Sequence, residues 1–378
     1  MITLLARFLH QRLRPTPLQS SSLASSQRIR PAAAGSTAAA SSSSPPPPNN
    51  KLTTPEGNSI ALDAAHISLP NTHNRRVIIV GDVHGCAGEL RSLLDRCFYR
   101  RGVDILIFVG DLVNKGPASA DVVRFVADEQ AYAVRGNHDD LALAAYINAT
   151  QHNQLPTKEK LKWVATLVGT KGAATVAQVL QNLPLSIHLP SYGVTIVHAG
   201  VVPGVVLEQQ QPQDLLKMRD VVPESCLDGE KGVEEAADES DMEVDVDDDD
   251  VSVPKKTFDW DTCLTRGERL IASERRNPGL GRAWASVYRG PSSHIFFGHD
   301  ASRRLQLEPW ATGLDAGCVY GGQLYAAVLP ALDERGEEVE GRAGTVRRGA
   351  QEIVLGTGKR AFLVSVPATM VHSPPKTK

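Results

Sequence analysis

The chain has 378 residues, 42% of them hydrophobic, and its 40 basic residues against 43 acidic residues give a formal net charge of −3. This length suffices for one large folded domain with tails, and the balanced charge gives no sign of a DNA-binding surface. No apolar run approaches the roughly 20 residues that would form a transmembrane segment. The five cysteines are scattered without a Cys-x-x-Cys pair, which argues against a zinc knuckle or a disulfide framework and fits a reducing compartment.

Residues 1–70 are predicted to form a disordered N-terminal tail. The first 55 are rich in Ser, Ala, Pro and Arg, and the first acidic residue is Glu56. Such Arg- and Ser-rich, acid-free N-termini are typical of organellar transit peptides. The pattern predicts import into mitochondria. The alternative is a tail without a targeting role, in which case the protein would be cytoplasmic.

Strands and helices alternate in the first part of the predicted domain. The apolar, β-branched run 77–80 predicts a buried strand, and apolar residues at helical spacing predict a helix over 88–98. Further strands are predicted over 105–109 and 131–134, with helices over 119–129 and 140–149. This order predicts parallel strands joined by right-handed crossovers. The residues that follow each strand should then meet at one edge of the sheet.

The rest of the domain, predicted to span 71–368, is less regular. We expect helices over 158–168 and 173–183, strands over 193–197, 294–297 and 323–329, and one or two closing strands within 353–366. The stretch 228–256, rich in Asp, Glu and small residues, is predicted to be a disordered insertion. A calcium-binding loop is the alternative, but the stretch lacks the spaced ligands and glycine of an EF-hand. Residues 333–350 are expected to form a loop, and 369–378 a C-terminal tail.

Metal-ligating side chains follow five of the predicted strands, each beside a glycine. Helix caps or core histidines explain five such coincidences poorly. Mixed oxygen and imidazole donors suit Mn²⁺, Fe or Zn²⁺, and the lack of cysteine among them argues against a structural zinc protein. Two such metals can bind a phosphate ester and activate water, while a histidine that is not a ligand protonates the leaving oxygen. The residues are Asp82, His84, Asp111, Asn137, His138, His198 and His299.

The order of these motifs resembles the calcineurin-like metallophosphoesterases over about residues 75–330. The motifs are Gly-Asp-x-His-Gly at 81–85, Gly-Asp-x-Val at 110–113, Gly-Asn-His-Asp at 136–139, His-Ala-Gly at 198–200 and the late His299. Lys-Gly-Pro at 115–117 and the His-Ala-Gly motif are most similar to the ApaH-like phosphatases. These are relatives of bacterial symmetrical diadenosine tetraphosphate hydrolases and of Ser/Thr phosphoprotein phosphatases. The resemblance implies an α/β four-layer sandwich with two central mixed sheets flanked by helices.

The resemblance also implies a site with two divalent metal ions, of Mn, Zn or Fe. One metal would be held by Asp82 and His84, Asp111 would bridge both, and the second metal would be held by Asn137, His198 and His299.

The resemblance gives the remaining site residues roles in catalysis. His138 would be the general acid, and Arg135 and Lys115 would bind the phosphate. Phosphoprotein phosphatases have an aspartate where this chain has Asn114. Asparagine can orient His138 but brings no charge, which speaks against phosphoprotein activity and not against metal-dependent hydrolysis.

We therefore expect a dinuclear-metal phosphohydrolase that cleaves phosphoanhydride or phosphoester bonds, with polyphosphate or a dinucleoside polyphosphate as the favoured substrate. Capped RNA ends and phosphoproteins are further substrates within the resembling branch. One alternative is a Ser/Thr phosphoprotein phosphatase. Another is a catalytically silent scaffold that binds partners through its acidic insertion, although a binding module has no need of His138 beside a full set of metal ligands.

Overall fold

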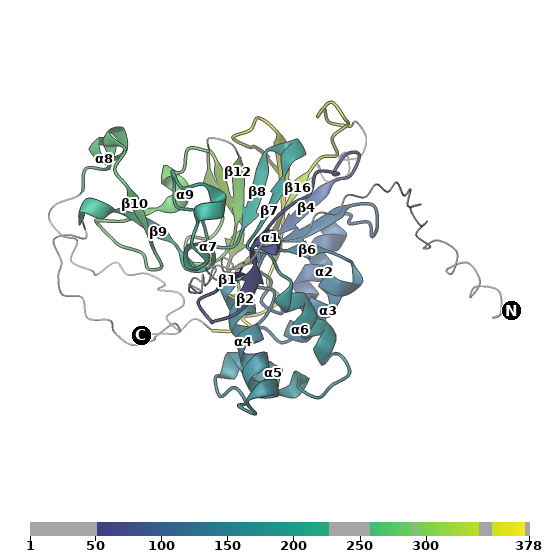
Figure 1. Cartoon of the computed structure of the whole chain (residues 1–378). Coiled ribbons are helices and arrows are strands. Elements are labelled where there is room, and N and C mark those ends of the chain that lie inside the picture. The colour runs from purple at the N-terminus through teal and green to yellow at the C-terminus, as the bar shows by residue number, and fades with distance from the viewer. Residues whose placement is uncertain (1–50, 227–257, 291–292, 340–349, 375–378) are drawn as a thin grey trace, which may run out of the picture. The chain divides into compact units, whose positions relative to one another are not determined.

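Two mixed β-sheets lie face to face at the centre of the computed structural model (Figure 1). The structure describes residues 51–226, 258–290, 293–339 and 350–374, which all belong to one unit spanning 48–378. The predicted transit peptide and the acidic insertion 228–256 lie outside the described residues. No helix within these ranges is long and apolar enough to cross a bilayer.

The first sheet contains the predicted parallel strands at its centre. Strands β4, β5 and β6 run parallel, and β16 pairs with β4 in the antiparallel sense. Every residue of β4 and β5 is buried, as expected for strands covered on both faces. In spatial order the strands are β17 (Gln351–Val354), β18 (Arg360–Pro367), β16 (Gln323–Leu329), β4 (Val77–Val80), β5 (Ile105–Phe108) and β6 (Tyr132–Ala133), with β15 (Asp315–Ala316) beside β16.

The second sheet is also mixed. Strands β8 and β12 are parallel and completely buried, whereas β7 pairs with β8 in the antiparallel sense. Its spatial order is β13 (Gln306–Glu308), β14 (Ala311–Gly313), β12 (His294–Phe297), β8 (Val194–Val197), β7 (Ser186–Leu189) and β3 (His66–Ser68). Apolar side chains such as Ile79, Ile107 and Ile196 fill the layer between the two sheets.

Helices cover the outer face of each sheet. On the first sheet, Leu90, Leu93 and Val122 belong to one core with Ile78 and its neighbours. The helices of that layer are α2 (Ala87–Arg96), α3 (Ser119–Asp128), α4 (Asn137–Gln151), α5 (Lys162–Leu167), preceded by η1 (Glu159–Leu161), and α6 (Ala173–Gln181).

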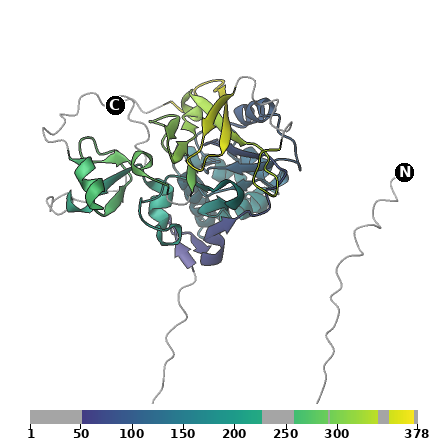
Figure 2. The ribbon, with the colours of Figure 1, turned by 90° about the horizontal axis from the view of Figure 1, so that it is seen from above.

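The outer face of the second sheet forms a separate core around Trp284 and Phe297. Helices α7 (Pro212–Lys217), α8 (Trp260–Arg266) and α9 (Trp284–Val287) lie there, with a small sheet of β10 (Leu270–Ser273), β9 (Asp220–Pro223) and β11 (Arg282–Ala283). Figure 2 shows the green segment around α8 on the opposite side from the blue helix α2. The predicted four-layer architecture is confirmed.

Single 3-10 turns occur at η2 (Pro190–Tyr192), η3 (Leu207–Gln209), η4 (Glu224–Cys226) and η5 (Cys318–Tyr320).

Both predicted boundaries of the domain are wrong. Residues 51–68, assigned to the N-terminal tail, form β1 (Lys51–Thr53), β2 (Ser59–Ala61), α1 (Leu62–Ala65) and β3, which pairs with β7. These elements have three or four residues and bury few side chains, so they leave a weak apolar pattern. At the other end, Thr369 and His372 hydrogen-bond to buried Glu89, so the ordered chain extends beyond residue 368.

Candidate metal centre

The ends of five strands bring the predicted ligands together. Asp82 and His84 follow β4, Asp111 follows β5, and Asn137 and His138 follow β6. His198 follows β8, and His299 follows β12. Helix α4 begins at Asn137, three residues before the predicted start, so Asn137 and His138 stand in its first turn. All of these side chains are buried except Asn137, which is half-buried.

Three of these residues have a left-handed backbone. The φ angles are +46° at His84, +50° at Asp111 and +68° at His299. Non-glycine residues rarely adopt this conformation, and it is commonest at functional sites. Close packing restricts the neighbours as well, because a side chain at Gly136 would collide with Asp111 and one at Gly298 with Asp82. The glycines beside the motifs therefore provide room for the carboxylates.

Asp111 lies between two groups of histidines. Its Oδ2 atom is 3.5 Å from Nε2 of His84, and its Oδ1 atom is 3.4 Å from Nε2 of His198. Two sets of metal-ligating atoms each fall within 4.8 Å of one another, and Asp111 belongs to both. One set contains His84 and His138, and the other contains His198 and His299.

Backbone carbonyls fix which ring nitrogen of each histidine faces the centre. His84 Nδ1 lies 3.0 Å from the Val113 carbonyl, and His198 Nδ1 lies 2.9 Å from the Val109 carbonyl. In His299 it is Nε2 that lies 3.0 Å from a carbonyl, that of Lys217. A carbonyl only accepts, so these nitrogens donate, and in the neutral rings the opposite nitrogens present lone pairs. Metal-binding histidines are oriented in this way.

In the neutral rings, the lone pairs of His198 Nε2 and His299 Nδ1 both face the side-chain oxygen of Asn137, with no proton between these atoms. Asn137 Oδ1 is 3.0 Å from His198 Nε2 and 3.2 Å from His299 Nδ1. Burial lowers the pKa of His198 below its ordinary value, which favours the neutral ring. Three acceptor atoms this close repel one another unless a cation lies among them. The donor set therefore fits a metal ion.

The Asp82 carboxylate also lacks a full set of partners. Its Oδ2 accepts from the His299 amide at 2.9 Å, whereas its buried Oδ1 has no hydrogen-bond partner within the described residues. Burial, together with the nearby Asp315 and Asp111 carboxylates, raises the pKa of Asp82 well above its ordinary range. A bound cation would offset both the burial and the repulsion.

Asn114 holds His138 through an amide of defined orientation. The Trp163 indole N–H donates to Asn114 Oδ1 at 2.7 Å, so the amide nitrogen faces His138. That nitrogen is 3.1 Å from His138 Nδ1 and 3.0 Å from the His138 carbonyl. Because an amide nitrogen only donates, His138 Nδ1 accepts and the proton of the neutral ring is on Nε2.

The two predicted phosphate-binding cations differ in placement. Lys115 Nζ lies 3.2 Å from His84 Nε2, beside the centre. Arg135 is completely buried, and its guanidinium binds Asp140 at 3.0 Å and the carbonyls of Gln181 and Leu183. The prediction that Arg135 binds the phosphate is therefore not supported, because all three of its guanidinium nitrogens are engaged within the fold.

The geometry has a counterpart among known proteins. Residues 75–303 match the family model of the calcineurin-like phosphoesterases. The chain belongs to this family. The resemblance inferred from the motifs is thus confirmed, and the protein is a metallophosphoesterase.

Relatives of this phosphoesterase include symmetrical bis(5'-nucleosyl)-tetraphosphatases. That of Nitrosococcus oceani is 29% identical over 279 residues, which cover 67% of this chain and 92% of the relative. That of Pseudomonas putida is 29% identical over 277 residues, with 65% and 86% coverage. A crystal structure of a candidate diadenosine tetraphosphatase is 31% identical, with a TM-score of 0.54 and coverage of 80% and 98%.

Two structural features of the phosphoesterase site were missed by the sequence analysis. Trp163 lies in α5 and has no motif around it that signals a role. Asp139 caps the start of α4, where its carboxylate accepts from the amides of Gly136 and Leu112. Asp139 was recognised in the sequence only as part of the Gly-Asn-His-Asp motif. The structure adds that its bond from the Leu112 amide holds the loop that carries Asp111.

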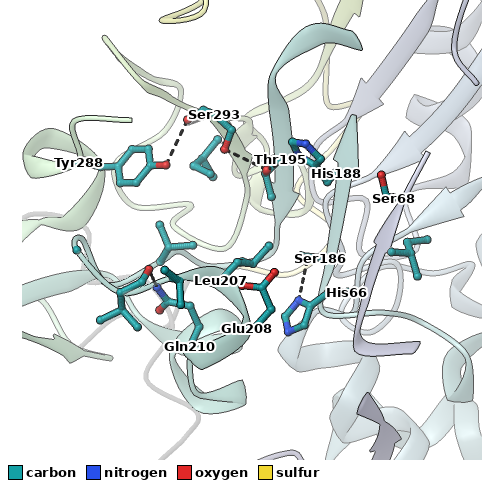
Figure 3. Close-up of a pocket in the computed structure, with 16 residues that line it drawn as sticks. His66, Ser68, Ser186, His188, Thr195, Leu207, Glu208, Gln210, Tyr288 and Ser293 are labelled. Carbon is teal, nitrogen blue, oxygen red and sulfur yellow. Dashed lines mark hydrogen bonds between the residues drawn. The ribbon is translucent and has the colours of Figure 1, made fainter. Parts of the chain in front are cut away.

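A cavity of about 560 Å³ lies apart from the metal centre, on the outer face of the second sheet (Figure 3). His188 and Ser293 both lie within hydrogen-bond distance of Thr195 there, and His66 within that of Ser186. None of the residues that line it belongs to the predicted site. The chemistry of the family is instead assigned to the buried cluster, whose donor atoms fit a metal.

Proposed function

We propose that this metallophosphoesterase is a dinuclear-metal phosphohydrolase that cleaves phosphoanhydride or phosphoester bonds. The observation that carries the proposal is the position of Asp111, with one carboxylate oxygen toward each group of histidine nitrogens. Asp111 would bridge two divalent ions, of Mn, Zn or Fe. Asp82 and His84 would complete the first site, and Asn137, His198 and His299 the second.

The bound metals supply positive charge to the phosphate and lower the pKa of an attacking water molecule. His138 would protonate the leaving oxygen through Nε2 as the imidazolium, because loss of a proton from the neutral ring would leave an imidazolate. Lys115 contributes a point charge beside the first site. Arg135 instead stabilises the start of α4 through Asp140.

We propose polyphosphates, and dinucleoside polyphosphates first among them, as the substrate class. The support is the similarity over nearly the whole length of proteins described as symmetrical bis(5'-nucleosyl)-tetraphosphatases. The uncharged Asn114 at the His138 contact speaks against phosphoprotein hydrolysis, as argued from the sequence. A cleaved dinucleoside tetraphosphate should yield two nucleoside diphosphates.

The test is hydrolysis by the metal-reconstituted full chain on a parallel panel. The panel contains diadenosine tetraphosphate, inorganic polyphosphate, capped RNA and a phosphopeptide, with Asp111→Asn as the blank. Turnover of a polyphosphate that is lost in Asp111→Asn supports the proposal. Turnover of the phosphopeptide alone favours a phosphoprotein phosphatase, and no turnover together with no bound metal favours the silent scaffold.

A further inference from the structure

A second group of metal-ligating side chains lies outside the candidate metal centre. Cys86 immediately precedes α2, Glu89 is in its first turn, and His372 comes from the C-terminal segment. One donor atom of each residue lies within 4.8 Å of the other two. Cys86 and Glu89 are buried and the His372 side chain is 10% exposed, so this is not a chance grouping of surface charges.

A fourth donor stands next to Cys86. Cys318, at the start of η5, is 2% exposed and belongs to the same buried core cluster as Cys86. The Cys86 thiol donates to the His84 carbonyl at 4.0 Å. Thiols are weak hydrogen-bonding groups, so within the described residues these two sulfur atoms have no strong partner.

The C-terminal segment is fixed to the cluster by its own hydrogen bonds. Glu89 Oε1 accepts from the Thr369 amide at 3.0 Å, the Thr369 hydroxyl at 2.5 Å and His372 Nε2 at 2.8 Å. The His372 amide donates to the Val319 carbonyl, one residue beyond Cys318. The backbone thus places His372 beside both α2 and the loop of Cys318 before any metal binds.

We propose that Cys86, Glu89, Cys318 and His372 form a zinc site of structural type. Two thiolates, an imidazole and a carboxylate are ligands that Zn²⁺ accepts in tetrahedral sites, whereas Mg²⁺, Ca²⁺ and Mn²⁺ prefer oxygen. With Zn–S bonds of ~2.3 Å and Zn–N or Zn–O bonds of ~2.0 Å, neighbouring ligand atoms in a tetrahedral site are about 3.3–3.8 Å apart. That spacing is compatible with the 4.8 Å limit that holds among Cys86, Glu89 and His372. Cys318 is not part of that group, so its side chain would have to move toward the other three ligands to complete the tetrahedron.

Metal binding would exchange some of the present contacts for coordination. Cys86 and Cys318 would lose their protons, and His372 would bind through Nε2 in place of its hydrogen bond to Glu89. The Thr369 hydroxyl and amide would remain as donors to the Glu89 carboxylate. The site would join the C-terminal segment and the η5 loop to the loop that carries His84, two residues before Cys86.

Cobalt substitution tests the proposal with a readout that does not depend on turnover. The full chain is reduced, stripped of metal and loaded with Co²⁺, and its near-ultraviolet spectrum is recorded. The candidate metal centre offers nitrogen and oxygen donors only, so a sulfur-to-cobalt charge-transfer band reports thiolate ligands. We expect this band in the native chain, and a loss of one bound metal per chain together with the band in Cys318→Ser.

Two further variants keep the test decisive. Cys97→Ser removes a buried thiol at the other end of α2 and should retain the band and the metal content. His372→Gln alters a residue near the end of the chain and should weaken binding of Co²⁺ at this site more than tenfold without loss of folding, monitored by circular dichroism. The proposal is overturned if the native chain lacks the band, or if the band is unchanged in both Cys318→Ser and His372→Gln. The cluster would then be only a set of hydrogen bonds to Glu89.

Discussion

Trp163 donates its indole N–H to the side-chain oxygen of Asn114 at 2.7 Å, and this one bond determines which end of the Asn114 amide meets His138. Asn114 is completely buried, so a reversed amide would place its oxygen against the His138 carbonyl, 3.0 Å from the present nitrogen. Two acceptors in that position would repel each other. Trp163 is therefore a positioning residue that acts on His138 through Asn114.

Trp163→Phe should lower kcat about tenfold with little change in KM. The variant loses a buried hydrogen bond of ~1–3 kcal/mol that positions His138, whereas the groups that bind the substrate are unchanged. The measurement is steady-state kinetics of the metal-loaded chain. Nitrogen chemical shifts of His138 at fixed pH provide a second readout, since the Nε2–H tautomer should become less populated. Trp260→Phe, in α8, is the matched control. An unchanged tautomer in Trp163→Phe would contradict the positioning role.

Asp111→Asn should remove both metals and lower kcat at least about a thousandfold. Asparagine keeps the shape but loses the charge and one of the two acceptor oxygens that face His84 and His198. Elemental analysis after desalting gives the metal content, and Asp121→Asn, on the exposed side of α3, serves as the control. Full metal content at a normal rate would refute the bridging role.

His138→Ala should keep both metals and lower kcat by about 10²–10⁴-fold, the range for loss of a general acid. This variant is the more informative because His138 belongs to the same 4.8 Å group as His84 and Asp111. If metal content falls with His138→Ala, then His138 is a ligand and its role as the acid is wrong. A substrate with a good leaving group should recover much of the rate if the acid role is correct.

Strands with both faces buried were predictable from sequence, and so was the convergence of the residues after them. Val77–Val80 and Ile105–Phe108 form unbroken apolar runs because each is covered by a sheet and by helices. By contrast, β3 pairs only with β7 at the edge of its sheet and buries little. Its side chains carry no pattern that separates it from a polar tail.

The motifs did not predict the direction of the Arg135 side chain. Arg135 directly precedes the Gly-Asn-His-Asp motif, and the family resemblance implied that it binds the phosphate. Its actual partners include the Gln181 and Leu183 carbonyls, 46 and 48 residues away, at the end of α6. Only the packing of α6 against α4 creates those acceptors, and no local pattern indicates it.

Arg135→Met should therefore reduce stability and leave KM nearly unchanged in the fraction that folds. Removal of one partner from a buried ion pair leaves the Asp140 charge uncompensated, at a cost of about 3–5 kcal/mol. Urea unfolding gives the loss, and the double variant Arg135→Met/Asp140→Asn should recover part of it. A large rise in KM at unchanged stability would instead return Arg135 to the substrate site.

His294 should make the fold sensitive to mild acid. It is 1% exposed, and burial lowers the pKa of its imidazole from 6.5 to about 4. The Gly356 amide donates to His294 Nδ1 at 3.1 Å, and Nε2 lies 2.9 Å from the Thr312 hydroxyl. A proton added at Nδ1 would point at the Gly356 N–H, so the folded state resists the charge that the unfolded chain accepts near pH 6.5.

Because the unfolded state binds the proton first, the free energy of unfolding should fall as the pH decreases from 6.5 to 4. Below pH 4, His294 should cause no further decrease in the free energy of unfolding. A pKa difference of this size corresponds to about 3 kcal/mol at the acid end. Urea unfolding between pH 7.5 and pH 4 measures it. His294→Gln should be less sensitive to pH over that range, whereas His73→Gln, at an exposed position, should follow the native chain. If His294→Gln loses stability with acid as steeply as the native chain, the acid sensitivity arises elsewhere, for instance from the buried carboxylates of the metal centre.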